Sequence, residues 1–175
     1  MNGASNGLHD RLKKTTAISM LGQGMDVGNL NSFSHQIALY LLLKVFHREI
    51  NNNFQRTKAD LIEMVEQIIK EMKLEADREQ SERLVEGVLY AGDPRQQANF
   101  SAMLYDEVSR SHKEYKFRYL IPDREASKWD EGGSTVYMLT ETAQEIIFIT
   151  REVLQEFGFS FIFCPLMIIM HFRSK

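Results

Sequence analysis

The chain is poor in the residues that build covalent cross-links and many metal centres. Its 175 residues include one cysteine, three prolines and one tryptophan. The lone Cys164 excludes an internal disulfide bond and a cysteine-based zinc site, and it suits a reducing compartment, so a cytoplasmic location is expected. The polar N-terminal stretch has no apolar segment followed by a small-residue cleavage site, which disfavours a secretory signal.

Neither sign of charge dominates. The chain has 21 basic and 24 acidic residues, a net charge of −3 and an isoelectric point near 6.0. Proteins that coat nucleic acid without sequence preference are usually strongly basic, so that class is disfavoured, whereas a local basic patch is not excluded. The hydrophobic content of 43% is enough for the core of one globular domain.

Catalytic and ligand-binding motifs are absent from the pattern. No two histidines have the spacing of a zinc hydrolase, no serine lies in a G-x-S-x-G turn, and the glycines between 22 and 28 follow no strand. The carboxylates between residues 123 and 131 are typical of a solvated loop rather than a metal site. We therefore expect no enzyme, no cofactor, no metal and no small-molecule substrate.

Hydrophobic periodicity predicts a mainly helical chain. Residues 1–31, rich in Gly, Asn and Ser, are expected to form a loose leader. Apolar residues at helical spacing then predict helices over 32–50, 57–73, 77–91 and 95–110. Ser32 or Ser34 is expected to cap the first of these helices, Thr57 with Asp60 the second, and Asp77 the third.

A strand pair and a further helix follow. Alternating apolar residues predict that 115–121 pairs with 134–139 as a β-hairpin, with Gly132-Gly133 in its turn. Thr140 is placed to begin a helix that runs to residue 157. Three helices followed by such a hairpin is the layout of a winged helix-turn-helix. The predicted fold is therefore mainly α with a small β-hairpin, in a winged-helix domain over 32–157.

The last segment, 158–175, breaks the composition because it is almost entirely apolar. A membrane-spanning helix needs about 20 apolar residues, and this run is shorter and contains Pro165. Three interpretations compete: a buried strand pair, a membrane-seeking tail, or a truncated or non-native end. We favour a packing or non-native tail over a membrane anchor.

The expected recognition helix, 77–91, is a poor match to DNA. Its polar face offers Arg78, Gln80 and Arg83, but four carboxylates lie among them, at 77, 79, 82 and 86. Phosphate contacts dominate nucleic-acid affinity, so these acids disfavour binding in the major groove. Basic residues also gather between 44 and 58 and between 113 and 118, where they form either a modest backbone-binding surface or ordinary solvated surface.

The predicted hairpin turn is a better candidate for contact with a protein. Trp129 there is flanked by Arg124 and Lys128, and exposed tryptophan beside cations is typical of binding hot spots. Packing of Trp129 back onto the hairpin is an equally weighted alternative. The predicted set of partner or DNA contacts is Arg78, Arg83, Arg118, Arg124, Lys128, Trp129 and Tyr137.

Residues 33–157 resemble a known family in layout. The residues that carry the resemblance lie where the second hairpin strand runs into the helix, together with one tyrosine of the first strand: Tyr119, Val136, Tyr137, Leu139, Thr140, Thr142 and Ala143. They are similar to winged-helix domains, and more narrowly to the N-terminal region of kleisin-like subunits of bacterial SMC complexes of the condensin (MksF) and Wadjet type. The resemblance implies a non-enzymatic subunit that bridges an SMC-type ATPase in chromosome maintenance or plasmid defence. The chain departs from that family by ending soon after the helix, in the apolar segment; under this resemblance the remainder of such a subunit would be missing, and bridging would then be impossible.

The sequence thus leads to three functional hypotheses. The first is a winged-helix interaction module in a DNA-associated assembly, with a protein partner. The alternative is a DNA-binding transcriptional regulator, with the helix from Thr140 as the seam of a homodimer. The third is an enzyme of unrecognised type, which needs a pocket with convergent polar groups. A membrane partner is not expected.

Overall fold

The computed structural model describes residues 3–91, 99–129, 132–156, 160–164 and 167–171. The main helices are α1 (Gly3–Met20), α2 (Ser34–Ile50), α3 (Lys58–Glu71), α4 (Arg78–Leu89) and α5 (Glu141–Glu156), with short 3-10 helices η1 (Gly28–Phe33) and η2 (Ala126–Trp129). The strands are β1 (Phe100–Asp106), β2 (Ser111–Phe117), β3 (Leu120–Pro122), β4 (Tyr137–Leu139), β5 (Ser160–Cys164) and β6 (Met167–His171). The predicted class, mainly α with a small β component, is confirmed at that level.

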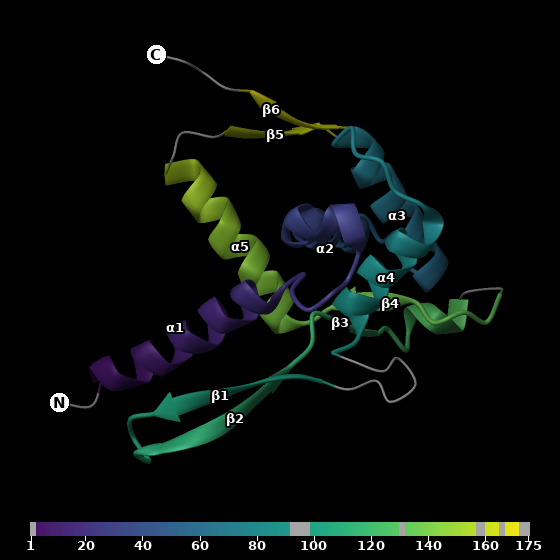
Figure 1. The fold of residues 1–175 in the computed structure, drawn as a ribbon. Helices are drawn as coiled ribbons and strands as arrows, with labels where there is room; N and C mark the ends of the chain where they lie inside the picture. The colour runs from purple at the N-terminus through teal and green to yellow at the C-terminus, as the bar shows by residue number, and fades with distance from the viewer. Residues whose placement is uncertain (1–2, 92–98, 130–131, 157–159, 165–166, 172–175) are drawn as a thin grey trace.

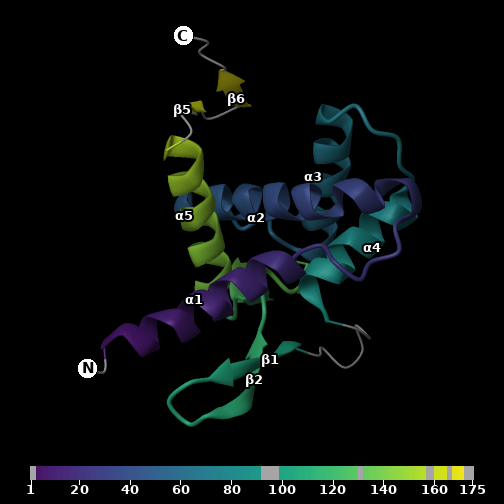
Figure 2. The same ribbon diagram turned by 60° about the vertical axis from the view of Figure 1, so that its left-hand side comes forward.

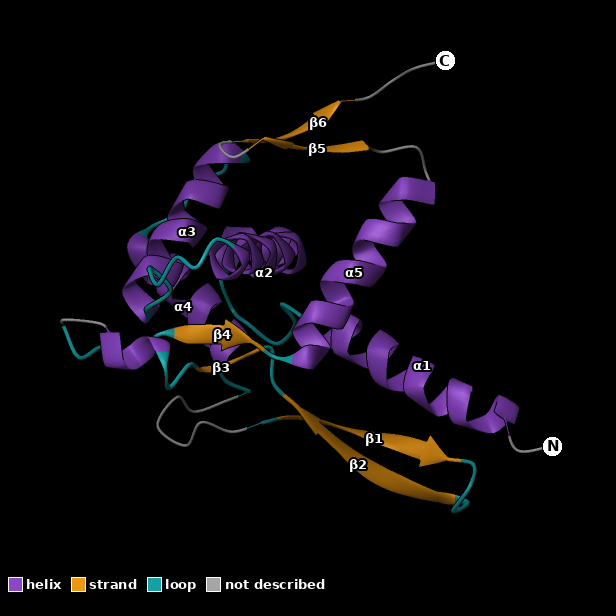
Figure 3. Cartoon of the chain, turned by 180° about the vertical axis from the view of Figure 1, so that it is seen from behind, coloured by secondary structure: helices purple, strands orange, loops and turns teal. Residues whose placement is uncertain are grey.

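Helix α2 forms the centre of the core. Its inward residues recur at helical spacing and are fully buried: Ile37, Ala38, Leu41, Leu42 and Val45. Helices α3 and α4 lie on one side of α2, and α5 and α1 lie on the other (Figure 1). Seen from behind, the β3–β4 pair runs beneath α2 between α4 and α5 (Figure 3).

The predicted caps of α3 and α4 are both present. The Thr57 hydroxyl accepts the Asp60 backbone N–H, and the Asp60 carboxylate accepts the Thr57 N–H at 2.8 Å. Asp77 and Gln80 form the same reciprocal pair at the start of α4. Each box satisfies backbone donors that the first turn of a helix leaves unpaired, which is why these boundaries follow from sequence.

The expected cap of α2 is wrong. No side-chain hydrogen bond caps the N-terminus of this helix, and the Ser34 hydroxyl instead donates to the Gly22 carbonyl at 2.7 Å and to the Asn31 carbonyl at 3.0 Å. Gly22 has φ +73°, and a Cβ there would lie 2.7 Å from the backbone of His35. Glycine is therefore required where the chain passes closely over the start of α2.

The loose leader expected over residues 1–31 is not what the structure shows. Residues 3–20 form α1, and Ala17, Leu21, Val27 and Leu30 are fully buried. The buried Tyr119 hydroxyl donates to the Ala17 carbonyl at 2.7 Å. The apolar residues in this stretch are too widely spaced to predict the helix, which gains its place by packing on distant segments.

The helix predicted over 95–110 is also wrong. Residues 100–106 form β1, which pairs antiparallel with β2 from Phe100↔Phe117 to Asp106↔Ser111. The apolar residues at 100, 103, 104 and 108 fit a helical period, but the side chains that are buried are Phe100, Leu104 and Asp106, all on one face of the strand. The β1–β2 hairpin extends beneath α1 (Figure 2), and Lys13 of α1 lies over the ring of Tyr115 in β2.

The hairpin predicted between 115–121 and 134–139 is present only in part, because the pairing joins the ends of the two predicted strands. Strands β3 and β4 pair antiparallel, from Leu120↔Leu139 to Pro122↔Tyr137. Residues 115–117 belong instead to β2. An isolated antiparallel bridge joins Thr57, just before α3, to Val136, so the α2–α3 connection lies alongside β4.

The apolar C-terminal segment contains one antiparallel strand pair. Strand β5 pairs with β6 from Ser160↔His171 to Cys164↔Met167, and the predicted tail also includes residues outside the described ranges. No helix within those ranges combines the length and the apolar character needed to cross a membrane.

Candidate docking site on the β3–β4 connection

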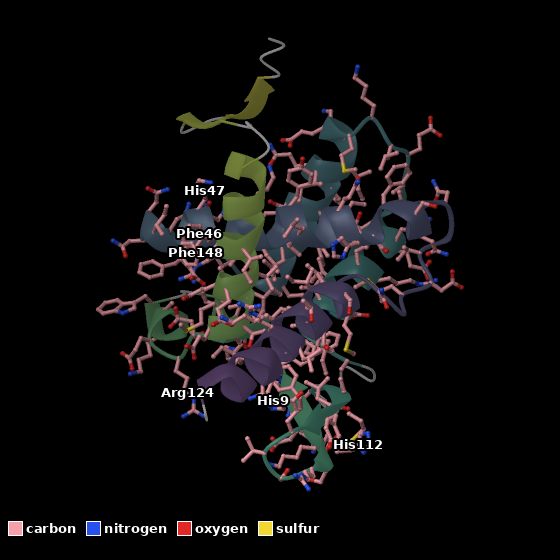
Figure 4. The ribbon with its side chains drawn as sticks, turned by 90° about the vertical axis from the view of Figure 1, so that its left-hand side faces the viewer. His9, Phe46, His47, His112, Arg124 and Phe148 are labelled. Atoms are coloured by element: carbon pink, nitrogen blue, oxygen red, sulfur yellow. The ribbon has the colours of Figure 1, made fainter. Side chains whose placement is uncertain are left out.

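Three of the predicted contact residues lie together on the connection between β3 and β4. We call residues 123–129 the Trp129 segment; it contains η2. The Trp129 side chain is 76% exposed, and Arg124 and Lys128 are exposed beside it in sequence. Arg124 points outward from the edge of the molecule (Figure 4). Of the two alternatives for Trp129, the structure shows the exposed one.

The backbone of the Trp129 segment is held by hydrogen bonds at its base. The Asp123 carboxylate accepts the Ala126 N–H at 3.0 Å, and the Asp123 carbonyl accepts the Ser127 N–H at 2.9 Å and its hydroxyl at 2.6 Å. The Ser127 oxygen in turn accepts the Val136 N–H at 3.0 Å. These bonds close the turn and join its two ends.

Arg56 anchors this base to the helical core. Its side chain is only 4% exposed, and its guanidinium bridges two carboxylates, Glu49 at 3.2 Å and Asp123 at 3.3 Å. It also donates to two carbonyls, those of Tyr137 at 2.9 Å and Asn53 at 3.0 Å. One cation therefore ties together the end of α2, the α2–α3 turn, the end of β3 and strand β4.

Glu49 links the same cluster to β4. Its carboxylate accepts the Leu139 N–H at 2.5 Å as well as the Arg56 guanidinium. Burial raises the pKa of Glu49 above its ordinary value, although the Leu139 N–H and Arg56 both act in the opposite direction. The cluster has polar partners throughout, as buried charges require.

The charges around Trp129 are mixed rather than uniformly basic. Lys128 pairs with Glu125 at 2.8 Å, with both side chains well exposed. Such exposed pairs contribute little to stability, so the lysine remains available to a partner. The surface combines a large aromatic side chain with charges of both signs.

The two arginines of α4 are engaged with carboxylates. Arg78 lies 3.6 Å from Glu66 and 3.4 Å from Glu82, and Arg83 lies 2.5 Å from Glu79. Both remain more than half exposed, but each has acids as neighbours. This face of α4 is therefore electrostatically unfavourable for a phosphate backbone.

The basic residues between 44 and 58 do not form an open cationic surface either. Arg56 is buried, as described above. Lys44 pairs with Glu71 at 3.3 Å and Lys58 with Glu86 at 2.6 Å. For this group of residues, the pairs favour an ordinary solvated surface over a surface that binds a nucleic-acid backbone.

Tyr137 and Arg118 are not part of the exposed site. Tyr137 is only 8% exposed, and its hydroxyl lies 3.2 Å from that of Tyr90, so the expectation that it is a surface contact is not met. Burial raises the pKa of Tyr137, and the nearby positive charge of Arg118 partly offsets that shift. Arg118 is half-buried beside this tyrosine.

The structure also contains a cleft of about 590 Å³ between the α1–η1 connection, α4 and the start of β1. Met20, Met25 and Phe100 line it together with Arg83 and Glu86. The Trp129 segment does not contribute to it. No group of three or more histidine, cysteine or acidic side chains is arranged for a metal ion within the described ranges.

Comparisons with protein-family models, with curated proteins and with solved structures give no match. The site must therefore be interpreted from its own geometry. Sequence reasoning identified the exposed residues of the Trp129 segment but missed the Arg56 cluster beneath it. Arg56 follows three asparagines, Phe54 and Gln55, and nothing local in the sequence marks it as buried.

Proposed function

We propose that this chain is a non-enzymatic, cytoplasmic winged-helix interaction module that docks onto a protein partner through the Trp129 segment, within a DNA-associated assembly. The observation that carries the proposal is the 76% exposed Trp129 on a turn whose base is tied to the core. An exposed tryptophan on a fixed backbone offers a large contact area at low entropic cost.

The arrangement of elements supports the winged-helix interpretation. Helices α2, α3 and α4 precede an antiparallel pair, β3–β4, whose connection has the place of a wing. The bridge from Thr57 to Val136 adds the short strand that such domains carry between their first two helices. The β1–β2 hairpin, inserted between α4 and β3, is a departure from the simplest form of that fold.

The distribution of charge favours a protein over DNA as the direct partner. In a DNA reader, α4 would lie in the major groove and present free cations to phosphates and bases. Here Arg78 and Arg83 are each paired with glutamates, and Lys58 is paired with Glu86 of the same helix. Tryptophan and arginine, by contrast, are enriched in the centres of protein interfaces.

The resemblance to kleisin-like subunits suggests what kind of partner this is. It implies that the partner is an SMC-type ATPase. Such a partner belongs to an assembly that works on DNA, and this chain would not need to bind DNA directly. A role in chromosome maintenance or plasmid defence would follow from such a partner.

Site-specific photocrosslinking in the source cells tests the proposal. A photoreactive residue at Lys128 should yield a discrete protein adduct, because the position borders Trp129. The same residue at Gln67, exposed on α3, is the matched control and should not yield that adduct. Identical adducts at both positions, or none at Lys128, would overturn docking through the Trp129 segment. An adduct of twice the chain's mass would replace the heterologous partner by a second copy of the chain.

A further inference from the structure

We propose that Arg56 is a positioning residue for the Trp129 segment, holding it in one conformation so that docking does not require its ordering. The effect on docking rests on the proposed function, whereas the effect on the conformation of the Trp129 segment does not depend on any partner. This role falls to a buried side chain that does not touch the docking surface.

The first step is the placement of Arg56 between the core and the segment. Its guanidinium contacts Glu49 on α2 at 3.2 Å and Asp123, the first residue of the segment, at 3.3 Å. The Glu49 and Asp123 side chains are 17% and 20% exposed, so water competes only weakly for them. The segment is thereby fixed to a helix far away in sequence.

The second step runs from Asp123 to the tip. The Asp123 carboxylate that meets Arg56 also accepts the Ala126 N–H, and its carbonyl holds Ser127 through two hydrogen bonds. Trp129 follows two residues later, at the end of η2. If Arg56 is removed, Asp123 loses its cation and the segment loses its ionic link to Glu49 of α2.

A docking surface that is already ordered in the free chain lowers the free-energy cost of binding, because the segment does not have to become ordered when the partner binds. When only a fraction of molecules holds the binding-competent conformation, the apparent affinity falls by that fraction. The Arg56 cluster would therefore change docking affinity without forming any contact with the partner.

Backbone ¹⁵N relaxation on the full chain provides the test, because it reports order residue by residue without a partner. Arg56→Met and Asp123→Asn should each lower the backbone order parameters of residues 124–129 from roughly 0.85 to below about 0.6. Order parameters in α2 and α3 should not change. Arg78→Met, which alters an exposed arginine, is the control and should leave residues 124–129 as they are.

Asp123→Asn keeps the test decisive if Arg56→Met fails to fold, since it removes the charge that pairs with Arg56 and retains an oxygen that can accept the Ala126 N–H. Unchanged order at 124–129 in the folded variants would overturn the positioning role, even if Arg56→Met is less stable. In the crosslinking assay, Asp123→Asn should lower the yield at Lys128 by roughly two- to threefold. If order falls but wild-type chain gives no adduct at Lys128, the positioning role stands and the proposed function fails.

Discussion

Replacing Arg56 by methionine leaves two partly buried carboxylates without their shared cation. Removing one partner of a buried ion pair costs about 3–5 kcal/mol, because the remaining charge is left without compensation. Glu49 and Asp123 are 17% and 20% exposed, so water would relieve part of this cost. We therefore expect Arg56→Met to lower the free energy of unfolding by about 3 kcal/mol. For a chain of this size that corresponds to a fall of roughly 6–12 °C in Tm.

Equilibrium unfolding in urea, followed by circular dichroism at 222 nm, measures this loss directly. Arg78→Met is the matched control, because Arg78 is 65% exposed and its pairs with Glu66 and Glu82 are solvated. It should cost no more than about 1 kcal/mol. Adding Glu49→Gln to Arg56→Met should recover part of the loss, since it removes one stranded charge. A loss of less than about 1 kcal/mol in Arg56→Met would refute the idea that this cluster anchors the fold.

Three further predictions concern other parts of the molecule. Burial raises the pKa of Glu49, so the folded state binds a proton there more tightly than the unfolded state does. The free energy of unfolding should therefore fall as pH rises from about 4.5 through the raised pKa. Glu49→Gln should flatten that part of a profile of Tm against pH. Gly22→Ala should cost more than Gly24→Ala by about 1–3 kcal/mol in urea unfolding, because both have positive φ but only a Cβ at Gly22 meets backbone; equal costs would contradict the close approach to α2. Tyr119→Phe should cost about 1–3 kcal/mol by stranding a buried carbonyl of α1, whereas a neutral result would mean that α1 does not pack as described.

The sequence predicted correctly those features that depend on residues close together in the chain. The capping boxes at Thr57 and Asp77 depend on residues three positions apart, and the pairing of β3 with β4 follows from alternating apolar residues beside a glycine turn. The exposure of Trp129 was one of two predicted alternatives. These features need no knowledge of the rest of the fold.

What it missed depends on contacts between distant residues. Helix α1 is placed by packing and by the Tyr119–Ala17 hydrogen bond, which spans 102 positions. The residues of β1 satisfy a helical period as well as a strand, and the pairing with β2 decides between the two. Arg56 is buried because Glu49 and Asp123 converge on it from separate elements, which no local pattern shows.

Duplex DNA binding by the full chain, followed by fluorescence anisotropy of a labelled duplex at low and moderate salt, distinguishes a protein-docking module from a direct reader of DNA. We expect no binding at low salt, because the cations of α4 are already paired with carboxylates and the Trp129 segment carries charges of both signs. Tight binding that weakens steeply as salt increases would contradict this expectation, and would make the chain a direct reader of DNA rather than a module that docks onto a protein.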